Sequence, residues 1–137
     1  MLNPFMWARR RALMAANKGP TQGLVNGSYY NGQIVVTNNN TITVTSESPS
    51  SFWCKIPLIS PITPTGSCYS YLMYDNGSSA GSYARLATYD ENNGLIAQYG
   101  SNPAYWTGRG VYYVAPYIGS YATTFKLTVV NNGQTVF

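Results

Sequence analysis

The residues best suited to binding chemistry cluster in and beside one short stretch, NPAYWTGRG. Tyr105 and Trp106 offer aromatic faces that can stack on the C–H surfaces of a sugar, and Arg109 offers donors for sugar hydroxyls. Tyr99 and Asn102 lie close by in the sequence. We take these five residues as a candidate glycan-binding site. The alternative is that Trp106 is a core residue and that the loop covers one end of the domain.

The side chains that catalysis usually needs are scarce in this chain. It contains no histidine, which excludes Ser-His-Asp and Cys-His machinery. Of its four carboxylates, Asp75 and Asp90 lie next to Gly/Asn turns, where aspartate is ordinary. We therefore expect no enzymatic activity, no catalytic residue and no cofactor.

We also expect no metal site. Two cysteines without a histidine cannot complete a four-ligand zinc site. The stretch DENNG, from Asp90 to Gly94, places oxygen ligands in a tight loop and weakly resembles a calcium loop. It lacks the later bidentate glutamate of such loops, and a hairpin turn accounts for it fully.

The two cysteines leave a choice open. Cys54 and Cys68 lie in strand-like runs on either side of a proline-rich loop, so their positions allow them to be cross-strand neighbours. An oxidising compartment would then permit a disulfide. Two buried free thiols are the alternative.

Charge is distributed unevenly along the chain. Residues 1–18 contain four basic residues and no acidic one, whereas residues 19–137 contain four of each. The isoelectric point near 9.1 therefore describes the first 18 residues. Because the remainder has no excess of positive charge, we do not expect it to bind nucleic acid.

Residues 1–18 are predicted to form a basic helix or arm. Asn3 and Pro4 are typical of a helix start, and Gly19 of a helix end. The apolar run after the arginines is too short for a signal peptide or a membrane span. Large apolar side chains and arginines are typical of interface cores, so we interpret this segment as an assembly arm. Its expected docking residues are Phe5, Met6, Trp7, Arg9, Arg10, Arg11, Leu13 and Met14.

Three other interpretations of this arm stay open: an interfacial amphipathic helix, a phosphate-binding arm and a solvated tail. In each case residues 19–28, GPTQGLVNGS, are expected to act as a linker.

Residues 29–137 predict an all-β domain. The stretch QIVVTNNNTITVTS predicts a hairpin that turns at Asn38–Asn40, and YARLATYDENNGLIAQYG predicts a second that turns at Asn93-Gly94. SFWCKIPL predicts a strand that ends in the loop ISPITPTGS. Eight to ten short, evenly spaced strands favour an antiparallel β-sandwich of the jelly-roll type, with an immunoglobulin-like topology as the alternative.

The layout resembles a known class of proteins. The head MWARRRALMAA, a glycine-containing linker and a β-sandwich together resemble small virion structural proteins of tailed bacteriophages and prophages. ATYDENNGLIAQ and GVYYVAPYIGSYATTFKLTVV are similar to the jelly-roll, carbohydrate-module-like domains of such proteins.

This resemblance implies a structural protein on the phage particle, acting in capsid decoration, as a head fibre or in the tail. Its partners would be other capsid or tail proteins, and it would form a homo-oligomer such as a trimer. The chain has no repetitive shaft, which favours a compact decoration or adaptor protein.

Two further functions stay open. The first is a carbohydrate-binding module for host-surface or mucus glycans, in which Tyr105, Trp106 and Arg109 make the contact. The second is a self-assembling extracellular filament subunit whose first 18 residues enter a neighbouring subunit.

Overall fold

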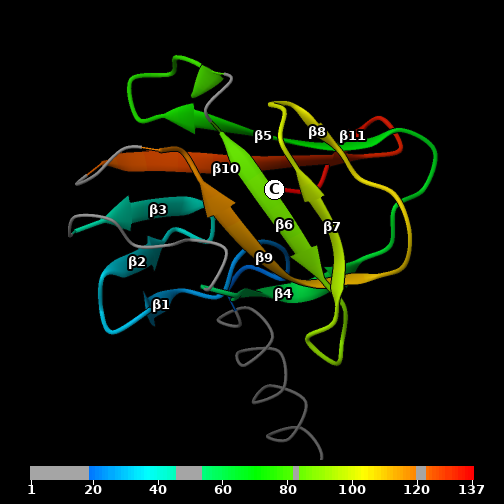
Figure 1. Cartoon of the computed structure of the whole chain (residues 1–137), viewed down its shortest axis with the longest axis horizontal. Coiled ribbons are helices and arrows are strands. Elements are labelled where there is room, and N and C mark those ends of the chain that lie inside the picture. The colour runs from blue at the N-terminus through cyan, green and yellow to red at the C-terminus, as the bar shows by residue number, and fades with distance from the viewer. Residues whose placement is uncertain (1–18, 46–53, 82–83, 120–122) are drawn as a thin grey trace, which may run out of the picture.

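The computed structural model in Figure 1 describes residues 19–45, 54–81, 84–119 and 123–137. These residues form strands and connecting turns, with no helix among them. The strands are β1 (Gly27–Tyr29), β2 (Ile34–Thr37), β3 (Thr41–Val44), β4 (Ile56–Ile62), β5 (Cys68–Tyr74), β6 (Arg85–Tyr89), β7 (Leu95–Tyr99), β8 (Ala104–Tyr105), β9 (Val111–Tyr117), β10 (Thr124–Asn131) and β11 (Gln134–Thr135).

The strands form two antiparallel sheets. Sheet 1 has the order β1-β2-β3-β10-β5-β8, with β11 also paired to β10, and sheet 2 has the order β4-β9-β6-β7. Strands β3 to β10 therefore form two sets of four, β3-β10-β5-β8 in sheet 1 and β4-β9-β6-β7 in sheet 2. This is the double Greek-key order of a jelly roll, which confirms the predicted all-β sandwich. The β1–β2 hairpin extends sheet 1 beyond this frame.

The two sheets pack face to face around one core. In Figure 1, β6 and β9 run diagonally across the roughly horizontal strands β3, β5 and β10. Alternate residues of β10, Phe125, Leu127 and Val129, are at most 1% exposed and contact the same cluster as Val114 of sheet 2. Each such side chain contributes roughly 1.5–3 kcal/mol by its burial.

Both predicted hairpins are confirmed. In the first, Ile34 pairs with Val44 and Thr37 with Thr41, and Asn38 and Asn39 adopt positive φ angles of 51° and 53°. Asparagine tolerates this left-handed region better than most residues, which explains the run of asparagines. In the second hairpin, Leu86 pairs with Tyr99 across the predicted Asn93-Gly94 turn.

The proline-rich segment differs from its prediction. The expected loop after Leu58 is still strand, because β4 continues to Ile62, with an irregular register between Pro57 and Ile62. β4 is an edge strand of sheet 2, and edge strands tolerate the missing N–H of proline. The sequence rule that prolines mark a loop therefore fails here.

The cysteines also differ from the cross-strand expectation. Cys54 lies two residues before β4 of sheet 2, whereas Cys68 begins β5 of sheet 1. Both are free and buried. The alternative of two buried thiols is the one that the structure shows.

Part of the segment expected to be a linker is packed onto the sandwich. Leu24 is fully buried and bridges to Leu58, and Val25 N donates to Pro57 O at 2.9 Å. Ile59 N donates to Gly23 O at 2.7 Å. These bonds occupy the outer edge of β4, so residues 23–25 act as a short additional edge of sheet 2.

Candidate binding surfaces

The turn between β6 and β7 is organised around Asp90. Its Oδ1 atom accepts hydrogen bonds from the backbone N–H groups of Asn92 and Gly94 at 2.9 and 2.8 Å. This is the local bonding by which aspartate stabilises tight turns. The DENNG stretch is thereby explained as turn chemistry, in agreement with the expectation from sequence.

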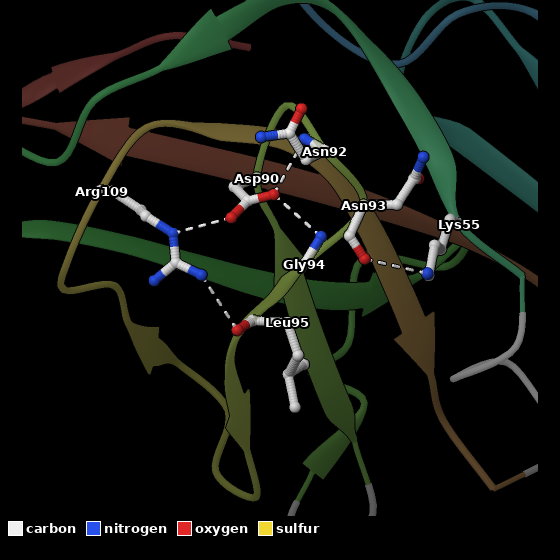
Figure 2. A network of polar contacts seen from close by, with 7 residues as sticks. All are labelled: Lys55, Asp90, Asn92, Asn93, Gly94, Leu95 and Arg109. Carbon is white, nitrogen blue, oxygen red and sulfur yellow. Dashed lines mark hydrogen bonds and ion pairs between the residues drawn. The ribbon is translucent and has the colours of Figure 1, made fainter.

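Arg109 joins this turn from the loop that precedes β9 (Figure 2). Its Nε atom lies 2.9 Å from Asp90 Oδ2, and its Nη2 atom donates to Leu95 O at 3.2 Å. The N–H of Gly94 and the guanidinium of Arg109 lower the pKa of Asp90 below its usual value. Asp90 therefore stays a carboxylate at neutral pH.

Lys55, the residue before β4, reaches the same turn. Its Nζ atom donates to Asn93 O at 3.2 Å and lies 4.5 Å from the centre of the Tyr89 ring. The ammonium group is attracted to the ring face as well as to the carbonyl oxygen. Lys55 and Arg109 thus hold the turn from two sides, as Figure 2 shows.

A hollow of about 250 Å³ opens beside this network. It is lined by Asp90, Glu91, Asn92, Arg109, Gly110 and Tyr112. The Arg109–Asp90 pair already uses the guanidinium Nε and one carboxylate oxygen. The hollow therefore offers a ligand mainly Glu91 and Tyr112, which is a weak basis for recognition.

The five residues of the predicted glycan site have different surroundings in the structure. Arg109 belongs to the β6–β7 turn, as described above. Tyr99 is half-buried, and its hydroxyl accepts a hydrogen bond from Thr107 N at 3.1 Å. Asn102 pairs with the edge of β5: Leu72 N donates to its Oδ1 at 2.9 Å, and its Nδ2 donates to Leu72 O at 3.0 Å.

Trp106 is a core residue. It is 3% exposed, and its indole N–H donates to the buried Ser70 hydroxyl at 2.8 Å. A ring in this position presents no face to a sugar. The burial of Trp106 agrees with the alternative interpretation, in which this side chain belongs to the core.

Tyr105, by contrast, is 60% exposed. It lies on β8 opposite Tyr69 of β5, and the two ring centroids are 5.7 Å apart. Tyr69 also stacks with Tyr71, two residues further along β5, at 6.4 Å and an interplanar angle of 24°. We call these three residues the tyrosine strip. It lies on the face of sheet 1 that points away from sheet 2.

The sequence contains a signal for this strip that the prediction missed. In CYSYLMY, the buried residues Cys68, Ser70 and Leu72 alternate with Tyr69 and Tyr71. This period of two places both tyrosines on one face of the strand. Tyr105 joins them only through the pairing of β8 with β5, which local sequence does not reveal.

The expected docking residues of the arm, from Phe5 to Met14, lie outside the described residues. Within the described part of the chain, no helix is long and apolar enough to cross a membrane. The same residues contain no group of three or more potential metal ligands.

Comparison with known proteins gives no relative. The chain matches no family model, no curated protein and no solved structure. The function is therefore argued from the residues and their geometry.

Proposed function

We propose that this chain is a non-enzymatic structural protein of a tailed-bacteriophage virion. Its jelly roll would be displayed on the particle surface, and residues 1–18 would dock on capsid or tail proteins. The observation that carries this proposal is the division of the chain. The excess charge and a set of large apolar side chains are concentrated in residues 1–18, beside a body with balanced charge.

Two strand edges of the body are covered by other parts of the chain. Open strand edges tend to pair with other chains. The outer edge of β4 is occupied by residues 23–25, and the edge of β5 beyond β8 is occupied by the side chain of Asn102. These two edges are therefore closed to pairing with another chain, whereas β1 and β7, which end the two sheets, each pair with one strand.

The chemistry of Asp90 supports the absence of catalysis. A general acid at neutral pH needs a carboxyl group with a raised pKa. The pKa of Asp90 is lowered, and Arg109 together with two backbone N–H groups already binds its oxygens. This carboxylate is therefore suited to holding a turn and unsuited to proton transfer.

The test is incorporation of the full chain into particles of the phage that encodes it. We expect Trp7→Asp/Leu13→Asp to reduce incorporation about tenfold or more, since buried aromatic anchors dominate interface energies. The control is Leu95→Asp, which adds one negative charge, against two in the arm variant, at a residue of the body that is 49% exposed. Circular dichroism confirms that both variants fold.

Two results would contradict the virion proposal. If purified particles do not contain the native chain, the protein is not a virion protein. If the arm variant and the control are incorporated equally, residues 1–18 do not mediate docking. Light scattering on the pure protein separates the filament alternative, because a filament subunit polymerises without any partner.

A carbohydrate-binding role is a second candidate, and one observation favours it. Tyr105 exposes 60% of its surface within a row of aromatic rings. Exposed aromatic rings are typical of surfaces that bind ligands. Among the five residues expected from sequence, Trp106 is buried, and Asn102 and Arg109 are bonded to Leu72 and Asp90, so such a site is better built from other neighbours of Tyr105.

A further inference from the structure

We propose that Tyr69, Tyr71 and Tyr105 bind an extended, neutral polysaccharide by stacking on the C–H faces of successive sugar rings. This inference rests on the carbohydrate-binding role named above as the second candidate. It replaces the residues expected from sequence with a different set, of which Tyr105 is the shared member.

The first argument is geometric. Tyr105, Tyr69 and Val130 are directly paired across β8, β5 and β10, and Tyr71 is paired with Thr128 of β10. All of these side chains therefore share the outer face of sheet 1. The rings follow one another at 5.7 and 6.4 Å. Such a row along the open face of a sheet fits an extended polymer better than a compact ligand, which needs a concave pocket.

The second argument is rigidity. Tyrosine presents a large contact area while losing little conformational freedom on binding. Below the strip, Trp106 N donates to Cys68 O and its indole N–H donates to Ser70, both at 2.8 Å. The backbone bond continues the pairing of β8 with β5 by one residue, and the indole bond holds the two segments together on the buried side. Trp106 is thus a positioning residue that holds Tyr105 beside Tyr69.

The third argument is charge. One charged residue, Lys126, is found among the outward-facing described residues of β3, β10, β5 and β8. These residues are Thr41, Thr43, Tyr69, Tyr71, Met73, Tyr105, Thr124, Lys126, Thr128 and Val130. A nucleic-acid surface would need several cations along the backbone path. The nearly neutral face, with its phenol and threonine hydroxyls, instead suits a neutral polymer rich in hydroxyl groups.

The fourth argument is area, which disfavours a second copy of this chain. Tyr105 is 60% exposed, and Tyr69 and Tyr71 are half-buried. With about 150–250 Å² for a whole tyrosine, the strip exposes on the order of 300 Å². A stable protein interface needs about 800 Å² on each partner. The strip alone is therefore smaller than one side of a stable interface, and it is large enough for a few sugar rings.

The test is affinity electrophoresis of the full chain in gels that contain hydroxyethylcellulose, glucomannan or dextran as neutral probes. Heparin and single-stranded DNA serve as anionic probes. We expect retardation by at least one neutral polysaccharide, and a loss of about tenfold in affinity for Tyr105→Ala. Tyr105→Phe keeps the stacking face and should stay within a few-fold of the native chain.

The matched control is Tyr30→Asn. Tyr30 is a tyrosine that is 37% exposed in the β1–β2 turn, where its φ angle of 50° is one that asparagine tolerates. This variant removes an exposed ring away from the strip and should leave the affinity unchanged. The melting temperature of each variant confirms that the fold is intact.

The possible results separate this proposal from the wider role. Binding to a neutral polysaccharide that survives both Tyr105→Ala and Tyr69→Ala/Tyr71→Ala would overturn the strip and keep the carbohydrate role. Absence of binding to every neutral probe would overturn both. Retardation by DNA alone that Tyr105→Ala abolishes would reassign the strip to nucleic acid.

Discussion

Trp106 and Ser70 are joined through the buried side of the sandwich, where the indole N–H donates to the serine hydroxyl at 2.8 Å. Both residues are almost fully buried, at 3% and 2% exposed. Because water does not reach the pair, each partner depends on the other for its hydrogen bond. The bond also connects β5 to the segment that follows β8. It adds to the two residue pairs between β8 and β5 and to the bond from Trp106 N to Cys68 O.

We predict that Trp106→Phe lowers the free energy of unfolding by about 1–3 kcal/mol, because it leaves the Ser70 hydroxyl buried and unpaired. Urea unfolding followed by circular dichroism measures this loss. Adding Ser70→Ala to Trp106→Phe should recover part of it, since the unpaired hydroxyl is then absent. Losses that simply add in the double variant would show that the two residues are not coupled.

This pair also shows what local sequence leaves undecided. Tyr105 and Trp106 are consecutive and point to opposite faces of the sheet, as strand geometry requires. Which of them faces the core depends on the pairing of β8 with Tyr69 and Ser70, more than thirty residues earlier. The sequence therefore shows that the segment carries aromatic side chains, but it cannot choose the exposed one.

The parts of the fold that were predicted well depend on short-range rules. The turns at Asn38–Asn40 and Asn93-Gly94 follow from the tolerance of asparagine and glycine for special backbone angles, and alternation defines the flanking strands. The packing of Leu24 on β4 and the placement of Cys54 and Cys68 in different sheets are long-range facts. No local pattern encodes them.

Asp90 makes stability depend on pH in a defined direction. Its pKa in the folded chain lies below the ordinary aspartate value of 3.8, mainly through the Gly94 N–H and then through Arg109. A lowered pKa contributes stability above pH 3.8, and this contribution is lost as the pH falls through the lower, folded value. We predict that Asp90→Asn lowers the melting temperature at pH 7 and that the difference from the native chain shrinks towards pH 2.5.

The control for this prediction is Glu91→Gln, which removes a carboxylate from the neighbouring exposed residue. Its melting temperature should follow that of the native chain across the same pH range. An Asp90→Asn curve that runs parallel to the native curve at all pH values would show that the charge of Asp90 makes no contribution.

The two cysteines should be chemically inert in the folded protein. Burial raises the pKa of both Cys54 and Cys68 to about 11, so the reactive thiolate is scarce at pH 8. We predict slow reaction with a disulfide reagent such as dithionitrobenzoate in buffer, and rapid reaction of two thiols per chain in guanidinium chloride. Rapid labelling of the folded protein, or the absence of thiols after denaturation without reductant, would contradict this prediction.

The contact between Gly23 and Asn39 determines whether residues 19–28 belong to the domain or merely lead to it. Gly23 has a φ angle of 116°, and a Cβ atom added there would lie 2.5 Å from Asn39 O. That oxygen accepts a bond from Leu24 N at 2.8 Å, and Asn39 Nδ2 donates to Gln22 O at 2.7 Å. A shift of the backbone at Gly23 or at Asn39 would break these two hydrogen bonds.

We predict that Gly23→Ala destabilises the protein by clearly more than Gly32→Ala, with thermal unfolding as the measurement. Gly32 also has a positive φ angle, 78°, but an added Cβ atom meets nothing within 4 Å. Both variants bear the backbone strain of about 1–3 kcal/mol, so their difference isolates the collision with Asn39. Leu24→Ala should cost about 2–5 kcal/mol, because it empties a fully buried site. Equal melting temperatures for Gly23→Ala, Gly32→Ala and Leu24→Ala would mean that this segment is a free linker in solution.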